Sequence, residues 1–275
     1  MSWSGGDDVI QHPETRSAGL ALGGGAARGW AHIGVIRALA ERNVRITHVA
    51  GTSIGAFVGA FFATRALDTL MTSVLQLTRK QVLSFVASLP SRTGLLKGHH
   101  ITSFLDQHLG AATLEQCSIP LATVATDLRT AREVTLDRGN IVEAVRASIA
   151  VPGVFTPIRR DNLLLVDGGL VNPVPVSTVR AMGADRVIAV DLNPVIRKGG
   201  LPLMEDGQPN MLEILGASAQ IIEATLTRTR LAADPPDLLI CPDLAHVSYQ
   251  DFHRGREIID LGYHAALAAL AESAW

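Results

Sequence analysis

A serine flanked by glycines constrains the fold of this chain more than any other feature. Residues 51–55 read Gly-Thr-Ser-Ile-Gly, after the short apolar run 46–50 and before the small and apolar residues 56–63. A strand, a tight turn and a helix are the context in which Gly-x-Ser-x-Gly forms a nucleophile elbow. Because the two backbones nearly touch there, Gly51 and Gly55 remove side chains that would collide. The Ser53 hydroxyl would then stand at the positive end of the helix dipole.

The pattern by itself also fits a structural turn. Gly-x-Ser-x-Gly occurs by chance in glycine-rich chains, and Ser53 could simply cap the N-terminus of the following helix. The flanking strand and helix favour a nucleophile, but the five residues alone leave both interpretations open.

A glycine-rich loop precedes the elbow by one strand and one helix. The apolar segment 18–22 leads into Gly23, Gly24 and Gly25, then Ala-Ala-Arg-Gly at 26–29 and a helical pattern over 30–42. The spacing is one residue too long for a dinucleotide fingerprint, the expected acidic residue is absent, and no Gly-Lys-Ser/Thr follows for a P-loop. An oxyanion hole remains, with the N–H groups of Gly24, Gly25 and Ala26 converging on one oxygen. A turn that binds nothing is the alternative.

A carboxylate ends a third apolar segment. Residues 163–166 are apolar and are followed by Asp167, Gly168 and Gly169. Strand ends are where parallel α/β folds place their sites. An aspartate in a turn can equally serve only to accept a hydrogen bond from its own backbone, and position alone favours that interpretation.

The remaining pattern predicts a single α/β domain over 18–275 after a flexible tail over 1–17. Helices are expected over 54–63, 67–89 with a break near Thr78, 101–109, 141–150 capped by Asn140, 176–182, 211–231 and 254–271. Strands are expected over 121–125, 133–136, 155–158, 163–166, 187–192 and 237–241, with the first four forming two hairpins. Loops are expected over 90–98 and 197–208.

Composition excludes several classes of protein. The net charge of −2, without a long basic run, gives no electrostatic footprint for nucleic acid. Hydrophobic residues make up 47% of the 275 residues, yet no run reaches the ~18 apolar residues of a membrane helix. The apolarity therefore predicts a thick core or an exposed surface for lipid or a partner, and the helical stretch 67–89 is the best candidate for a lid or lipid-facing surface.

The N-terminal residues and the cysteines predict an intracellular protein. The polar, acidic residues 1–8 do not resemble a signal peptide. Cys117 and Cys241 lie far apart in apolar settings, which predicts free core thiols in a reducing compartment and no metal site. We therefore expect a cytoplasmic protein that can contact the inner face of the membrane peripherally.

The three motifs, in this order, resemble the patatin-like phospholipase family. The bacterial branch related to the catalytic region of neuropathy target esterase is the most similar. Further stretches that resemble this branch lie at 31–35, 93–98, 125–128, 147–155 and 167–175. The resemblance covers about 18–192.

The resemblance implies a three-layer α/β/α hydrolase with a mainly parallel central sheet, a Ser-Asp dyad and no cofactor. Ser53 matches the nucleophile, Asp167 matches the base and the glycine loop matches the oxyanion hole, with Arg28 and Gly29 completing that motif. Relatives often carry a fourth glycine where this chain has Ala26, so a positive φ there would be harder to adopt. The implied partner is a lipid or lysophospholipid substrate.

Three alternatives stay open. A histidine triad could use His246, His253 or His264, which follow Asp167 in the chain, although this elbow comes after only two strands. The fold could also serve a lipid-binding regulator that is not an enzyme. An acyltransferase normally needs a histidine beside the serine, where this chain has Thr52. The other histidines, including His32, are interpreted as surface or packing residues.

Overall fold

A computed structural model describes residues 16–86, 98–193, 211–273 and 275. Most of the tail predicted over 1–17, nearly all of the loop over 90–98 and the whole loop over 197–208 lie outside these ranges.

Within these ranges, eight strands form one sheet in the order β5-β6-β3-β2-β1-β7-β8, with β4 paired to β3. The pairs within β3-β2-β1-β7-β8 are parallel, whereas β3 pairs antiparallel with β4 and β6, and β6 pairs antiparallel with β5. The predicted mainly parallel sheet with two added hairpins is therefore confirmed, but the first strand of the second hairpin is Ile158–Arg160, so the prediction of 155–158 for it is wrong. The strands are β1 Ser17–Leu22, β2 Arg45–Thr52, β3 Leu121–Asp127, β4 Arg132–Leu136, β5 Ile158–Arg160, β6 Leu163–Asp167, β7 Val187–Val190 and β8 Leu238–Ile240.

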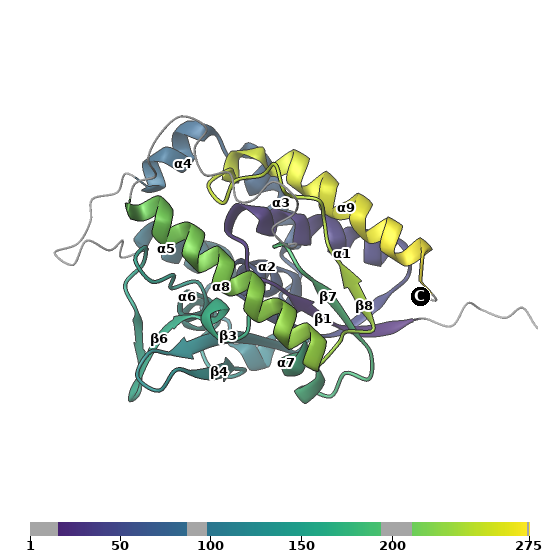
Figure 1. The fold of residues 1–275 in the computed structure, drawn as a ribbon, viewed down its shortest axis with the longest axis horizontal. Helices are drawn as coiled ribbons and strands as arrows, with labels where there is room; N and C mark the ends of the chain where they lie inside the picture. The colour runs from purple at the N-terminus through teal and green to yellow at the C-terminus, as the bar shows by residue number, and fades with distance from the viewer. Residues whose placement is uncertain (1–15, 87–97, 194–210, 274) are drawn as a thin grey trace, which may run out of the picture.

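The helices follow the sequence pattern closely (Figure 1). The break predicted near Thr78 separates α3 from α4. The helix expected from Trp30 begins one residue later, because Ala26–Trp30 forms a tighter 3-10 turn, η1. The helices are α1 Ala31–Glu41, α2 Ile54–Ala63, α3 Leu67–Gln76, α4 Arg79–Val86, α5 His99–Leu109, α6 Ile141–Ser148, α7 Val176–Ala181, α8 Met211–Ala233 and α9 Gly255–Ala271. Further short 3-10 turns are η2 Leu114–Gln116, η3 Gly168–Leu170 and η4 Phe252–Arg254.

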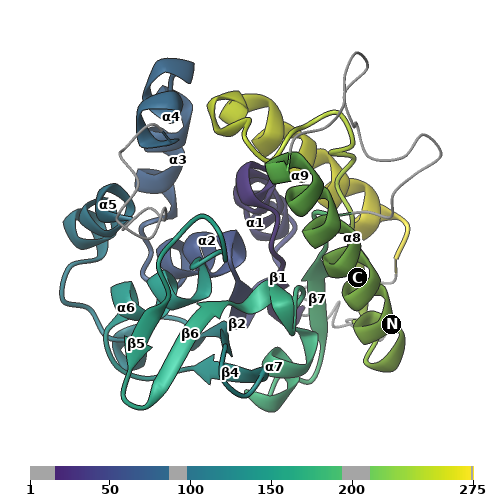
Figure 2. The same ribbon diagram turned by 60° about the vertical axis from the view of Figure 1, so that its left-hand side comes forward.

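Alternate strand residues face two separate apolar clusters, as the period of two in a strand requires. In β1, Leu20 and Leu22 belong to a large cluster shared with α1, α2, α6 and α9. Ala21 belongs to a smaller cluster shared with α7 and with Leu231 at the end of α8. Figure 2 shows α1 and α9 above the strands and α7 below them. The sheet is thus the middle of three layers, as expected.

A row of alanines lets α7 pack close to the sheet. Ala21 of β1 pairs with Ala50 of β2 and Ala189 of β7, and Ala50 pairs with Ala122 of β3. All four side chains are buried on the face covered by α7. Small side chains in register across four strands bring the helix axis near the sheet on this side.

One edge of β3 receives two strands end to end. Val124 pairs with Thr52, the last residue of β2, and the next residue, Ala125, pairs with Asp167, the last residue of β6. The opposite edge of β3 is taken by β4. Because β2 runs parallel to β3 and β6 runs antiparallel to it, the C-terminal ends of β2 and β6 point at each other. This junction positions the candidate site.

Most apolar side chains of the described residues lie in the core. Within the described ranges, no helix is long and apolar enough to cross a membrane. On the predicted lid helix, Leu70 and Val74 of α3 are buried, and Leu75 is exposed.

The prediction that both cysteines are core thiols is wrong for Cys241, which is exposed because it follows β8 at the sheet edge. Cys117 is half-buried, and the two form no disulfide with each other.

Candidate active site

Ser53 occupies a strained turn between β2 and α2. Its backbone has φ 55° and ψ −124°, in a region that non-glycine residues rarely enter. A Cβ on Gly51 would collide with the backbone of Ala56, and one on Gly55 would collide with the carbonyl of Leu22. The two glycines therefore permit the close crossing of strand and helix that the pattern predicts.

The Ser53 hydroxyl is directed at a carboxylate and away from the helix. Its Oγ donates to Oδ2 of Asp167 at 2.6 Å, a distance typical of a hydroxyl bonded to an ionised acceptor. The Ser53 side chain makes no capping hydrogen bond to α2. Capping alone therefore does not account for this serine.

Asp167 accepts hydrogen bonds both from its own turn and from Ser53. Its Oδ1 accepts the N–H of Gly169 at 2.8 Å, as a turn aspartate does, while Oδ2 accepts the Ser53 hydroxyl. Its side chain is buried, and burial raises the pKa of this carboxyl to about 6, against the lowering effect of the bonds from Ser53 and Gly169. Thr126 fixes the backbone by donating to the Asp167 carbonyl at 2.8 Å.

Ser148 supports the elbow, and the sequence analysis did not assign it a role. It lies at the end of α6, where its hydroxyl accepts the Ser53 N–H at 2.9 Å and donates to the Val124 carbonyl at 2.6 Å. Ser148 is fully buried. A buried serine inside an otherwise apolar helix face was the available signal.

The glycine loop offers fewer free donors than predicted. The N–H of Gly24 donates to the Pro173 carbonyl at 3.0 Å, so it is not available to an oxyanion, and that part of the prediction is wrong for this conformation. Among the described residues, the N–H groups of Gly25 and Ala26 have no hydrogen-bond acceptor. Ala26 has φ 49°, the left-handed conformation that a fourth glycine would adopt more easily.

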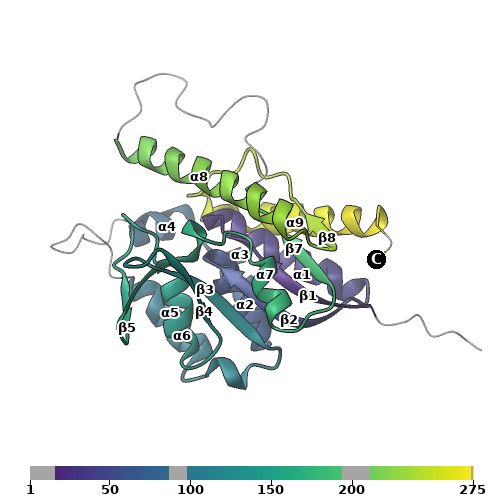
Figure 3. The ribbon, with the colours of Figure 1, turned by 60° about the horizontal axis from the view of Figure 1, so that its bottom comes forward.

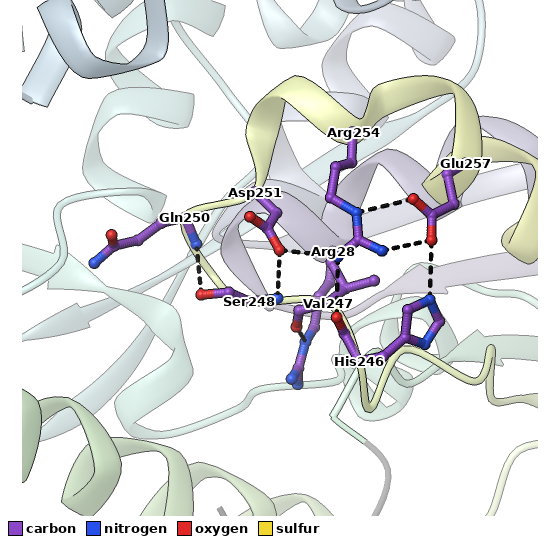
Figure 4. A network of polar contacts seen from close by, with 8 residues as sticks. All are labelled: Arg28, His246, Val247, Ser248, Gln250, Asp251, Arg254 and Glu257. Atoms are coloured by element: carbon purple, nitrogen blue, oxygen red, sulfur yellow. Dashed lines mark hydrogen bonds and ion pairs between the residues drawn. The ribbon is translucent and has the colours of Figure 1, made fainter. Parts of the chain in front are cut away.

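Arg28 ties the glycine loop to the C-terminal part of the chain. Its Nε donates to the Val247 carbonyl at 2.9 Å, as Figure 4 shows, and a second guanidinium nitrogen reaches Asn193 Oδ1 at 3.3 Å. Tyr249 lies under the guanidinium at 4.7 Å and donates its hydroxyl to the same Asn193 oxygen. Asn193 in turn donates to the carbonyl of Gly24. Arg28 therefore supports the loop from behind.

The other motif glycines are packing positions. A Cβ on Gly29 would collide with Ile54, and one on Gly168 would collide with the carbonyl of Val124. The N–H of Gly23 continues the ladder of β1 by donating to the Val190 carbonyl at 3.1 Å.

His32 and His246 have structural partners. His32 is fully buried and lies 2.8 Å from the carbonyl of Gly23, and burial lowers its pKa to about 4, so it is a neutral donor that holds the loop. His246 contacts Glu257 at 3.0 Å (Figure 4). Within the described chain, neither His246, His253 nor His264 bonds to Ser53 or Asp167.

Glu223 of α8 reaches the same site and was not predicted. Its Oε1 lies 2.8 Å from the position that a Cβ on Gly24 would take and 3.5 Å from the corresponding position at Gly169. A glutamate in the middle of a long helix carries no local signal of function, so the sequence alone could not have indicated it.

Comparison with known proteins identifies the family. The family model described as patatin-like phospholipase matches residues 20–180, more than half of the chain. The chain belongs to this family. The resemblance inferred from the three motifs is thereby confirmed, including its similarity to the relatives of neuropathy target esterase.

Several patatin-like relatives carry NTE in their names. An uncharacterized NTE family protein of Mycobacterium tuberculosis is 42% identical over 174 residues, which are 63% of this chain and 48% of the relative. Lysophospholipase NTE1 of Pyricularia oryzae is 29% identical over 280 residues, covering 93% of this chain and 18% of its own length. Neuropathy target esterase sws of Drosophila melanogaster is 32% identical over 64% of this chain and 13% of its own. The chain thus spans at most about half the length of these relatives.

Among solved structures, VipD from Legionella pneumophila aligns with 94% of this chain and 67% of its own, with a TM-score of 0.48 and 16% identity.

Proposed function

We propose that this protein is a serine esterase that hydrolyses fatty acyl esters of lipids, with Ser53 as nucleophile and Asp167 as general base. The observation that carries the proposal is the 2.6 Å hydrogen bond from Ser53 Oγ, in a strained elbow, to Oδ2 of the buried Asp167. A nucleophile within hydrogen-bond reach of its base, at the N-terminus of a helix, is the arrangement that activates a hydroxyl. We extend the proposal to a single catalytic domain over residues 18–275.

Acylation transfers one proton through Asp167. The carboxylate takes the hydroxyl proton as Ser53 Oγ attacks the ester carbonyl carbon, and the carbonyl oxygen becomes an oxyanion. When the tetrahedral intermediate collapses, the C–O bond to the alcohol breaks and Asp167 returns the proton to the departing oxygen. The acyl group is left as an ester on Ser53.

Deacylation repeats these steps with water. Asp167 takes a proton from the water that attacks the acyl-Ser53 ester, and a second tetrahedral intermediate collapses to release the fatty acid. The proton passes from Asp167 back to Ser53 Oγ, so the enzyme returns to its starting state.

Electrostatics must compensate for a weak base. The free N–H groups of Gly25 and Ala26 and the N-terminus of α2 stabilise the oxyanion, and one such donor is typically worth ~3 kcal/mol. Burial increases the basicity of Asp167 by raising its pKa to about 6, which brings it nearer to the ideal for a base working near neutral pH.

Apolar side chains next to Asp167 support an acyl substrate. Leu170 is 45% exposed three residues after Asp167, and Val151 and Val154 are exposed beside Ala150, whose carbonyl accepts the Asp167 N–H. They could contact an acyl chain or a membrane surface. The name of lysophospholipase NTE1 makes a lysophospholipid the first substrate to test.

The decisive experiment combines covalent labelling with a substrate screen. Wild type should react with a fluorophosphonate probe and release fatty acid from at least one of lysophospholipids, phospholipids and short-chain esters, whereas Ser53→Ala should do neither while keeping the wild-type circular dichroism spectrum. An added alcohol acceptor separates hydrolysis from acyl transfer. Equal activity in a folded Ser53→Ala protein would contradict the proposal, and absence of both labelling and hydrolysis in wild type would favour a lipid-binding regulator.

A further inference from the structure

The carboxyl group of Glu223 lies beside both members of the Ser53–Asp167 pair. It projects from α8, which runs along the outside of the molecule (Figures 1 and 3). At Gly24, its Oε1 and the Cβ of Ser53 lie 2.8 Å and 3.6 Å from the point where a glycine Cβ would stand. At Gly169, Oδ1 of Asp167 and Oε1 of Glu223 lie 3.2 Å and 3.5 Å from the corresponding point. The two glycines therefore leave room for this carboxyl between the glycine loop and the Asp167 turn.

Glu223 is half-buried and lacks a hydrogen-bond partner among the described residues. A polar group held in a site without a partner is available to a ligand. Because α8 is anchored at its far end by Leu231, which packs half-buried against the smaller apolar cluster, and by the contact of Arg230 with Glu133, the helix holds the carboxyl in place.

The charges around Glu223 favour its neutral form. Burial, and then the charges of Asp167 and Asp191, raise the pKa of Glu223 to about 8, while the Arg28 guanidinium acts in the opposite direction. Within the described chain, Tyr249 also faces it, and the pKa of that phenol is itself raised, first by burial and then by Glu223. Near neutral pH the carboxyl is therefore mostly protonated, and a protonated carboxyl has an O–H to donate.

The glycine loop is short of one donor. Gly24 N–H is bonded to the Pro173 carbonyl, which leaves only Gly25 and Ala26 of the three predicted amides. The carboxyl of Glu223 stands against Gly24, on the side occupied by Ser53. A neutral carboxylic acid retained in a site as a hydrogen-bond donor to an oxyanion is an established strategy in enzymes.

We propose that Glu223, in its protonated form, is a further catalytic residue that donates a hydrogen bond to the oxyanion formed on acylation of Ser53. This inference rests on the esterase activity proposed above. The proton stays on Glu223 throughout, so the group stabilises charge and takes no part in proton transfer. Once ionised, the same carboxyl would stand beside the oxyanion and Asp167 as a second negative charge and would oppose the reaction.

The test is a pH profile of kcat/KM for the full chain on lysophosphatidylcholine, whose headgroup charge is constant across the range used. Wild type should lose activity as the pH rises through about 8, where Glu223 ionises. Glu223→Gln keeps a donor that cannot ionise, so its neutral-pH activity should stay within about tenfold of wild type and its alkaline decline should disappear. Glu223→Ala removes the donor and should lower kcat/KM by about 10²–10³-fold. Thr225→Ala, at an exposed position of the same helix, is the matched control and should behave as wild type.

The outcomes distinguish this inference from the proposed function. An alkaline decline that is unchanged in Glu223→Gln, or a Glu223→Ala protein as active as wild type, would overturn the role of Glu223 while leaving the esterase intact. A Glu223→Ala protein more active than wild type would mean that the carboxyl obstructs the site, which also overturns it. A wild type without Ser53-dependent hydrolysis would overturn the proposed function and this inference together.

Discussion

Ser53 and Asp167 meet because the last residues of β2 and β6 pair with neighbouring positions on one edge of β3. Thr52 pairs with Val124 and Asp167 pairs with Ala125, so Ser53, which follows Thr52, meets Asp167 end to end along the same edge of β3. The 2.6 Å bond between their side chains closes this junction. The backbone around it is held by Ser148 and Thr126, so the geometry is set by the sheet and does not depend on a flexible loop.

Asp167→Asn should increase the stability of the protein and lower its activity. Burial raises the pKa of Asp167 from 3.8 to about 6, so between these values the unfolded state binds fewer protons and stability falls as the pH rises. Above pH 6 the buried charge of Asp167 lowers the free energy of unfolding by its full amount, up to about 3 kcal/mol, and below pH 4 it does not lower it. The asparagine variant should therefore have a higher Tm than wild type at pH 8, with the difference shrinking toward pH 4, while kcat falls by at least about 10³-fold. Equal Tm values for both proteins at pH 8 would contradict the burial argument.

The acid side of the activity profile should report the same group. Asp167 acts as a base only when ionised, so kcat/KM should rise with pH and level off above about 6. The measurement needs a neutral ester substrate, so that only the enzyme titrates. A midpoint near the ordinary value for an aspartate would show that the site is more solvated than its burial indicates.

The sequence predicted the order of elements and the three motifs because these depend on local properties. Gly51 and Gly55 mark a close crossing wherever they occur between a strand and a helix, and Asn140 caps α6 as its residue type predicts, by accepting the Glu143 N–H. The expected position of Asp167 at a strand end was correct, but the supporting argument was incomplete, since β6 is antiparallel to β3 and reaches the site from the opposite direction.

The parts that the sequence could not supply depend on contacts between distant segments. The bond of Gly24 to Pro173 spans about half the chain, and no local pattern indicates that this amide is already engaged. Glu223 lies far along the chain from the other site residues and enters the site only because α8 crosses them. Ser148 bonds to Ser53 through the packing of α6 against the sheet.

Ser148→Ala should impair the elbow more than its size suggests. The substitution removes the acceptor of the Ser53 N–H and leaves that buried donor unpaired, which costs about 1–3 kcal/mol. We expect a lower Tm together with a kcat/KM reduced by more than about tenfold, because the strained Ser53 backbone loses a constraint. Ser73→Ala, at a half-buried position of α3 where the hydroxyl donates to the Thr69 carbonyl of the same helix, provides the control. A Ser148→Ala protein that loses stability but keeps full activity would show that the elbow does not need this hydrogen bond.

Ala26→Gly should stabilise the protein without raising its activity. Ala26 has φ 49°, where an L-residue other than glycine pays about 1–2 kcal/mol of steric energy, and glycine removes that strain at the expense of some entropy in the unfolded chain. We therefore expect an increase of roughly 0.5–1 kcal/mol in the free energy of unfolding.

The neighbouring Ala27→Gly is the control: Ala27 is fully buried with a negative φ, so this variant should lose stability through its missing methyl group. The N–H of residue 26 is unchanged by either substitution, so the oxyanion contact proposed there should survive and kcat should stay within about twofold of wild type. If both glycine variants lost stability equally, the left-handed conformation at Ala26 would not be strained, and alanine would be as good a residue for this loop as the fourth glycine of its relatives.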